Sequence, residues 1–233
     1  MLPTNFAREG QAMKTKQQGF TLVEIAIVLV IIGLLLGGIL KGQEMITQAK
    51  IKNVIADMSG VSAAMYGYQD RYRALPGDDR NAAGRWTGSP APATGTTGNG
   101  VIEGRWTAAA TEAIIFWDHL RRAGFVSGSG PENPFNAVSG KMGVQSGDGT
   151  SATPGGVLSD GLATPTLFTS LLLCSGALPD KIAISVDAQM DDGVGTTGSV
   201  RSMRSPGNPD VIAAAASTYV EDGVSTYVIC RQM

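Results

Sequence analysis

The feature that most constrains this chain is an apolar run from Phe20 to Leu40. Its only ionisable side chain is Glu24, and it contains no proline. At a rise of about 1.5 Å per residue, such a helix is roughly 30 Å long, the thickness of the hydrocarbon core of a bilayer. Lys14 and Lys16 precede the run and Lys41 follows it. The pattern predicts a membrane-spanning helix with a basic flank on its N-terminal side.

Glu24 makes a plain membrane anchor an incomplete interpretation. Insertion of a carboxylate costs on the order of 2.5–3.5 kcal/mol near the centre of a bilayer and less toward its surface. Such a residue is therefore a candidate functional group, and we expect it to have a partner. One alternative is that Glu24 lies at the headgroup boundary and stays hydrated. The other is that cleavage after Gly19 creates a free amine on Phe20, within about one helical turn of Glu24 on the same chain or on a neighbour.

The sequence from Gly19 to Ile25 reads GFTLVEI and follows a short basic leader. It resembles the processing site of type IV prepilins and type II secretion pseudopilins. The resemblance implies that a prepilin peptidase cleaves after Gly19 and methylates the new N-terminal residue, Phe20. It also implies that Glu24 matches the N-terminus of a neighbouring subunit during filament assembly. The resemblance covers only about the first 55 residues, so it does not determine the structure of the rest of the chain.

The resemblance and the hydropathy pattern together divide the chain into four parts. We expect a leader at 1–19, a transmembrane or filament-core helix at 20–40, an amphipathic continuation at 41–75 and an extracytoplasmic globular domain at 76–233. The leader begins at Met1 or at Met13, because the residues from Met13 onward would suffice as a short basic leader. An ordinary secretory signal would be cut after the apolar run, but no A-x-A-like site follows it.

Beyond the apolar run, hydrophobic residues recur at steps of three and four, as on one face of a helix. These residues are Ile51, Val54, Ile55, Met58, Val61, Met65, Tyr68 and Tyr72. The sequence Leu75-Pro76-Gly77-Asp78 then ends the pattern, because proline and glycine interrupt helices. We therefore expect a long helix whose second half buries one face against the globular domain.

The segment after this helix is expected to be dominated by loops. Residues 76–106 are rich in Gly, Pro, Thr and Ala, which predicts an exposed excursion that Trp86 and Trp106 anchor to the domain surface. Residues 128–161 predict another long loop.

Between these loops, the apolar spacing predicts a helix from Thr107 to Ala123, with Gly124 as its C-terminal stop. The only histidine, His119, lies on this helix beside charged residues. We expect it on a solvated helix face rather than in a catalytic site.

The C-terminal third is expected to supply a small sheet. We expect a short helix from Pro165 to Cys174, capped by Thr164, and a strand over 182–186 from its period-two alternation. A partner strand is expected at 199–203 and a last strand at 224–230. The predicted fold class is α+β and pilin-like, with a long N-terminal helix packed on a small antiparallel sheet with long loops.

The charge and the cysteine content of the chain limit its expected partners and its redox environment. The formal net charge is −2, so no basic bias predicts a specific nucleic-acid partner. Cys174 and Cys230 either form a disulfide, which an exported domain permits, or remain reduced in the core. Pilin-like domains often staple their C-terminal region in this way, and the resemblance favours the bond.

The acidic residues Asp187, Asp191 and Asp192, followed by Gly193, could bind Ca²⁺, because hard cations take clustered carboxylates and backbone carbonyls. The spacing does not fit an EF-hand, and a solvated turn explains the cluster equally well. Some pseudopilins bind calcium in their C-terminal loops, so calcium is the one cofactor that the resemblance suggests. The sequence contains no Ser/His/Asp set, phosphate loop or Cys/His metal cluster, and we do not expect an enzyme.

Three functions remain open from the sequence. The first is a structural subunit of a type IV pilus-like filament, and the second is a type II secretion pseudopilin. The third is an extracytoplasmic protein that uses the helix only as a membrane tether. For either filament, the resemblance implies four kinds of partner: a prepilin peptidase and methylase, other copies and pilin-like subunits, an inner-membrane assembly platform, and membrane lipid. The expected location is the bacterial inner membrane with a cytoplasmic leader, followed by a pilus or a periplasmic pseudopilus.

Overall fold

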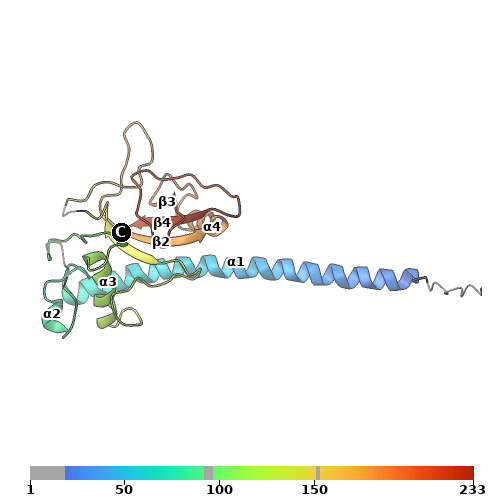
Figure 1. Ribbon diagram of the computed structural model, residues 1–233, viewed down its shortest axis with the longest axis horizontal. Helices are drawn as coiled ribbons and strands as arrows, with labels where there is room; N and C mark the ends of the chain where they lie inside the picture. The colour runs from blue at the N-terminus through green and yellow to red at the C-terminus, as the bar shows by residue number, and fades with distance from the viewer. Residues whose placement is uncertain (1–18, 92–96, 151–152) are drawn as a thin grey trace, which may run out of the picture. The chain divides into compact units, whose positions relative to one another are not determined.

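The computed structural model describes residues 19–91, 97–150 and 153–233. The chain divides into two compact units, one ending at Met45 and the other beginning at Ile46. Helix α1, Leu22–Tyr72, contributes residues to both units (Figure 1).

In the first unit, α1 is apolar on all sides. Every residue from Gly19 to Lys41 is exposed. Within the described residues, α1 is the one helix long and apolar enough to cross a bilayer. The predicted apolar helix is therefore present, and the described residues leave it uncovered up to Lys41.

In the second unit, α1 is striped as the three-and-four spacing predicts. Its buried residues are Ile51, Val54, Met58, Val61, Ala64, Met65 and Tyr68. The helix ends at Tyr72, and the next residue, Arg73, has a positive φ of 53°. Such a left-handed residue cannot continue a right-handed helix, so the helix ends slightly before the predicted breaker at Pro76.

Four antiparallel strands form one sheet in the order β1-β2-β4-β3 (Figure 1). The strands are β1 Met142–Ser146, β2 Leu171–Pro179, β3 Val200–Arg204 and β4 Thr226–Gln232. The predicted strands at 199–203 and 224–230 are confirmed as β3 and β4. The predicted layout, a long helix on an antiparallel sheet, is also confirmed.

One face of the sheet packs on helices. Val144, Leu173 and Ile229 share a hydrophobic core with the buried face of α1. Helix α3, Glu112–Arg122, packs near β1, and helix α4, Asp180–Met190, packs on the other three strands. This core accounts for the α+β architecture, because the sheet and the striped helix bury their apolar faces against each other.

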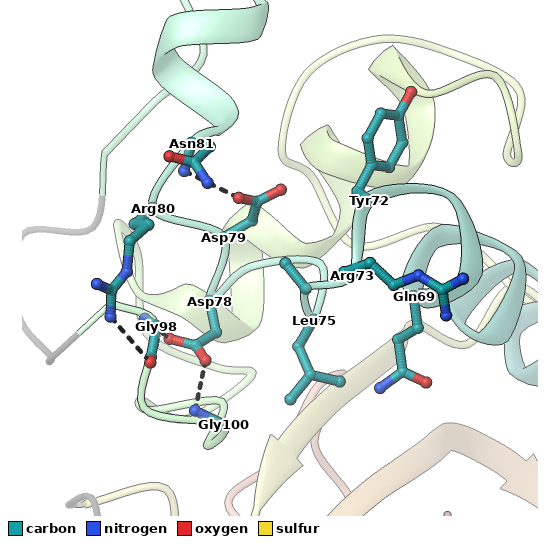
Figure 2. Close-up of a pocket in the computed structure, with 11 residues that line it drawn as sticks. Gln69, Tyr72, Arg73, Leu75, Asp78, Asp79, Arg80, Asn81, Gly98 and Gly100 are labelled. Carbon is teal, nitrogen blue, oxygen red and sulfur yellow. Dashed lines mark hydrogen bonds between the residues drawn. The ribbon is translucent and has the colours of Figure 1, made fainter.

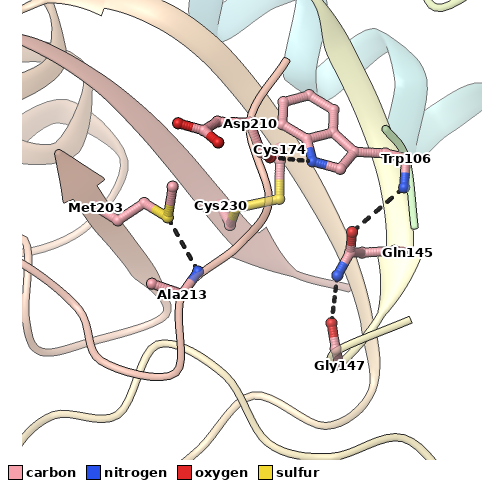
Figure 3. The surroundings of a disulfide bond; sticks show 8 residues. All are labelled: Trp106, Gln145, Gly147, Cys174, Met203, Asp210, Ala213 and Cys230. Carbon is pink, nitrogen blue, oxygen red and sulfur yellow. Dashed lines mark hydrogen bonds between the residues drawn. A yellow bond between two sulfur atoms is a disulfide. The ribbon is translucent and has the colours of Figure 1, made fainter. Parts of the chain in front are cut away.

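The opposite face of the sheet carries a second core, which is covered by loops rather than by helices. Leu172, Cys174 and Cys230 lie there with Trp106 and Phe168. Figure 3 shows the Trp106 indole beside the disulfide; its Nε1–H donates to the carbonyl of Asp210 over 2.7 Å. The sheet is therefore buried on both faces, and its strands lack a strict polar alternation.

Burial on both faces explains two incorrect predictions. The segment 165–174 is not a helix, because Leu171–Cys174 begins β2 as a continuous apolar run, which periodicity alone cannot separate from a buried helix. Strand β1 lies inside the predicted loop 128–161, and all five of its residues are buried.

The predicted strand at 182–186 is also wrong, because these residues belong to helix α4. After Asp180, its buried residues are Ile182, Ala183, Val186 and Asp187, which have the spacing of one helix face rather than strict alternation. Asp180 begins the helix and accepts the N–H of Gly223 over 2.6 Å. β3 therefore pairs with β4 rather than with residues 182–186.

The segments around α3 differ from expectation as well. The helix begins at Glu112 instead of Thr107, and Ala110, two residues earlier, has a positive φ of 56°. The predicted exposed excursion at 76–106 contains a short helix, α2 Ala82–Arg85, and buried residues including Ile102. Trp106 is 1% exposed, so it belongs to the core rather than anchoring a loop at the surface.

Candidate functional site

The first candidate site is the start of α1, where Thr21 and Glu24 bond to each other. Oε2 of Glu24 accepts the backbone N–H of Thr21 over 2.8 Å and its hydroxyl over 2.7 Å. In return, the N–H of Glu24 donates to the Thr21 hydroxyl over 3.2 Å. This reciprocal pair is a capping box, which satisfies N–H groups that the first helical turn leaves without partners.

The geometry leaves Glu24 able to take a further donor. Both of its hydrogen bonds end on Oε2, so Oε1 has room for an N–H donor from outside the helix. The preceding Phe20 is 83% exposed. An amine on Phe20 would therefore be accessible to the glutamate of another copy.

The apolar surface around this carboxylate has no cover within the described residues. Leu22 is 91% exposed and Leu34 is 73% exposed. An added Cβ at Gly33, Gly37 or Gly38 would contact nothing within 4 Å. Water disfavours a surface of this kind, so it requires lipid or other helices.

The residues proposed for processing are placed only in part. Gly19 and Phe20 lie just before the helix, and the leader residues before Gly19 are outside the described residues. Cleavage after Gly19, methylation of Phe20 and an assembly role for Glu24 stay predictions.

The two cysteines form a disulfide in the structure. Cys174 of β2 lies directly opposite Cys230 of β4 in the strand register, and their Cα atoms are 4.0 Å apart. Both residues are fully buried. The bond therefore ties the two central strands of the sheet together.

The second candidate site is the acidic cluster at the end of α4. One carboxylate oxygen from each of Asp187, Asp191 and Asp192 lies within 4.8 Å of the others. Oδ2 of Asp187 accepts the Tyr219 hydroxyl over 2.7 Å, and its Oδ1 is buried with no partner among the described residues. Burial raises the pKa of Asp187 to about 6, and the neighbouring carboxylates add to this effect.

The other two carboxylates of this cluster organise the loop that follows. Oδ2 of Asp191 accepts the N–H groups of Ser199 and Val200 over 2.5 and 3.0 Å. Oδ2 of Asp192 accepts the hydroxyl of Thr197 over 2.6 Å. The oxygen donors suit a hard cation such as Ca²⁺ chemically, and calcium binding here stays a prediction.

The expectation that His119 is solvated is wrong, because this side chain is only 2% exposed. Its Nδ1 accepts the N–H of Gly77 over 2.9 Å, and its ring stacks on Tyr68. Burial lowers the pKa of His119 to about 4. A neutral histidine at neutral pH joins α3 to the turn after α1, so its evident role is structural.

Two residues that sequence reasoning overlooked contribute to these sites. Thr21 holds Glu24, and the spacing T-x-x-E at a helix start is a signature that could have identified it. Tyr219 holds Asp187, but it is distant in sequence and no local signal links the two residues.

Comparison with protein-family models matches residues 14–40 to the prokaryotic N-terminal methylation motif. Comparison with curated proteins and with solved structures found no match. The chain thus carries a prepilin-type motif at its N-terminus. The motif implies a subunit like those of type IV pili or pseudopili, which are typically structural rather than enzymatic. It is also consistent with anchoring in the inner membrane before assembly.

Proposed function

We propose that this chain is a structural subunit of a type IV pilus-like filament. In this proposal the leader 1–19 is removed after Gly19, Phe20 is N-methylated, and the apolar helix assembles with other copies. One observation carries the proposal: the motif at 14–40 coincides with a helix whose residues 22–41 are all exposed. A single carboxylate, Glu24, interrupts that apolar surface.

The first step is membrane insertion. Lys14 and Lys16 favour a cytoplasmic leader under the positive-inside rule. The domain 76–233 then lies outside the cytoplasm, an environment in which the Cys174–Cys230 disulfide persists. Lipid is the first cover for the exposed helix.

The second step is processing by the prepilin peptidase and methylase. Cleavage converts the amide nitrogen of Phe20 into an amine that carries a positive charge when protonated. This charge is the natural partner for the carboxylate of a subunit already in the filament, because a carboxylate in apolar surroundings requires compensation.

The third step is transfer from lipid to the filament core on an inner-membrane assembly platform. Apolar helices of neighbouring copies replace lipid around 20–40, and Glu24 accepts the amine of a neighbour. The Thr21 capping box presents the carboxylate in a defined position for that contact. The globular domain supports this step because it buries one face of α1 between Ile51 and Tyr68. That core keeps the part of the subunit outside the membrane folded.

The direct test is the N-terminus of subunits purified from filaments. Mass spectrometry is expected to find a chain that begins with N-methylated Phe20. Subunits from a peptidase-deficient strain, the matched control, are expected to retain the leader and to form no filament. Filaments built of subunits with an intact leader would overturn the proposal.

The type II secretion pseudopilin remains the alternative, since the same motif and helix serve both machines. Deletion of the gene distinguishes the two. Loss of surface filaments with normal secretion of periplasmic substrates supports the pilus, and the reverse supports the pseudopilus. A simple membrane tether would show neither defect.

A further inference from the structure

Three carboxylates from separate segments converge at the start of α3. Asp78 lies in the turn after α1, Glu103 in the loop before α3, and Glu112 is the first residue of α3. Their exposed fractions are 3%, 9% and 0%. The N–H of Glu103 donates to Oε2 of Glu112 over 2.8 Å. A Cβ added at Gly77 would lie 2.5 Å from the carbonyl oxygen of Glu112, so the turn and the helix are in close contact.

The backbone of the loop 97–104 supplies hydrogen bonds to the Asp78 carboxylate. It accepts the N–H groups of Gly98, Asn99 and Gly100, the last two over 3.2 and 2.7 Å. Figure 2 shows this carboxylate pointing into the loop at Gly98 and Gly100. These N–H groups supply the hydrogen bonds that water would otherwise give the charged carboxylate. Asp78 thereby fastens the loop to the turn after α1.

Glu112 is less well solvated: the N–H of Glu103 and the side chain of Thr97 favour its ionised form, but burial outweighs them. Its Oε1 is buried without a partner among the described residues, and no described cation forms an ion pair with it. The nearby Arg80 donates instead to the carbonyl of Gly98 over 3.1 Å, and Arg85 pairs with Asp79. The other ionisable group at this junction, His119 of α3, accepts the N–H of Gly77. An ionised Glu112 would therefore face two like charges without a cation.

We propose that Glu112 is the pH-responsive member of a clasp that holds the loop 97–104 on the first turn of α3. With a proton on Oε1, Glu112 adds no charge to the cluster, and the N–H of Glu103 stays bonded to Oε2. When Glu112 ionises, repulsion from Asp78 and Glu103 together with the cost of a buried charge loosens the loop. The proposal concerns the globular domain and does not depend on filament assembly.

The direction of the response follows from linkage. Burial, reinforced by the charges of Asp78 and Glu103, raises the pKa of Glu112 to about 7 from its ordinary value of 4.5. Between pH 4.5 and 7, Glu112 is therefore largely protonated in the folded clasp and largely ionised in the open one. Its stability is full below pH 4.5, declines as pH rises toward 7, and levels off above it.

Hydrogen exchange on the full chain in detergent micelles tests the clasp. Protection of the amides of Glu103 and Gly98–Gly100, corrected for intrinsic exchange, is measured from pH 5.5 to 8.5 in the wild type and in Glu112→Gln. We expect protection in the wild type to fall about tenfold or more between pH 5.5 and 7 and to level off above pH 7. It is expected to stay nearly constant in Glu112→Gln, while Glu221→Gln, which alters an exposed carboxylate elsewhere, behaves like the wild type. Equal pH profiles in the wild type and in Glu112→Gln would overturn the proposal.

A second measurement requires no substitution, which matters if Glu112→Gln fails to fold. The ¹³C chemical shift of the Glu112 carboxyl is followed by NMR in the wild type. Titration near pH 7, where the loss of protection levels off, supports the clasp. Titration below pH 5 overturns it.

Discussion

The carboxylate of Glu24 accepts both the backbone N–H and the hydroxyl of Thr21, over 2.8 and 2.7 Å. The one ionisable side chain of the apolar run is therefore already bonded within its own helix before any partner arrives. The amine of a neighbouring subunit would add a further bond to a carboxylate that Thr21 already stabilises. Loss of Thr21 and loss of Glu24 should accordingly have different consequences.

Glu24→Ala is expected to abolish filament assembly while membrane insertion and cleavage after Gly19 continue. Thr21→Ala removes the cap, which is worth about 1 kcal/mol, and is expected to slow assembly without abolishing it. Filament yield and the processed fraction, both by immunoblot, check this prediction. Glu44→Ala, which changes an exposed carboxylate further along α1, is the control. Normal filaments built from the Glu24→Ala variant would contradict an assembly role for Glu24.

Removing the disulfide is expected to destabilise the globular domain by about 2–5 kcal/mol. Cys174 and Cys230 lie on neighbouring central strands within the core that described loops cover, so reduction releases a constraint between these two strands. Denaturant unfolding of the wild type, with and without reductant, measures the effect. The Cys174→Ala/Cys230→Ala variant should match the reduced wild type and be insensitive to reductant. No difference between oxidised and reduced wild type would contradict this expectation.

Two glycine substitutions are expected to change stability in opposite directions. A Cβ at Gly143 would overlap the buried ring of Trp106, so Gly143→Ala is expected to destabilise by about 1–3 kcal/mol. A Cβ at Gly60 would meet nothing within 4 Å on the exposed side of α1, so Gly60→Ala is expected to stabilise by about 1 kcal/mol. Thermal unfolding of both variants is the measurement. A Gly143→Ala variant at least as stable as the wild type would contradict the close packing of Trp106 against β1.

Acid is expected to destabilise the domain through His119. Its pKa is about 4 in the folded chain and 6.5 ordinarily, so the unfolded chain binds the additional proton between these values. Stability contributed by the neutral ring is present above pH 6.5 and is lost as pH falls toward 4, by up to about 3 kcal/mol. His119→Gln should remove this part of the pH dependence. The difference between the two unfolding curves isolates it from Glu112, whose effect has the opposite sign.

Calcium is expected to raise the melting temperature of the domain if Asp187, Asp191 and Asp192 hold the ion together. The melting temperature is compared in millimolar Ca²⁺ and in chelator, for the wild type and for Asp192→Asn. The variant should show no calcium-dependent shift. An unchanged wild-type melting temperature would leave the cluster as a loop-organising turn, a role that the bonds to Ser199 and Thr197 already support.

Local patterns determined the N-terminal half of this protein. The apolar run, the striped continuation and the motif around Glu24 each involve residues within one or two helical turns, and their spacing predicts the structure directly. The T-x-x-E signature would also have revealed Thr21, because a capping box is a local interaction. Likewise β3 and β4 were predictable, since turn residues separate them from their neighbours.

The tertiary structure alone decided the rest, because burial there depends on segments distant in the chain. Loops cover the outer face of the sheet, so Leu171–Cys174 is a strand without alternation, and Trp106 is a core residue within a glycine-rich segment. The same folding buried His119 and Glu112. Burial lowers the pKa of His119 and raises that of Glu112, so each favours its neutral form. Sequence spacing carries no record of that desolvation, which arises only when the turn after α1, the loop 97–104 and α3 pack together.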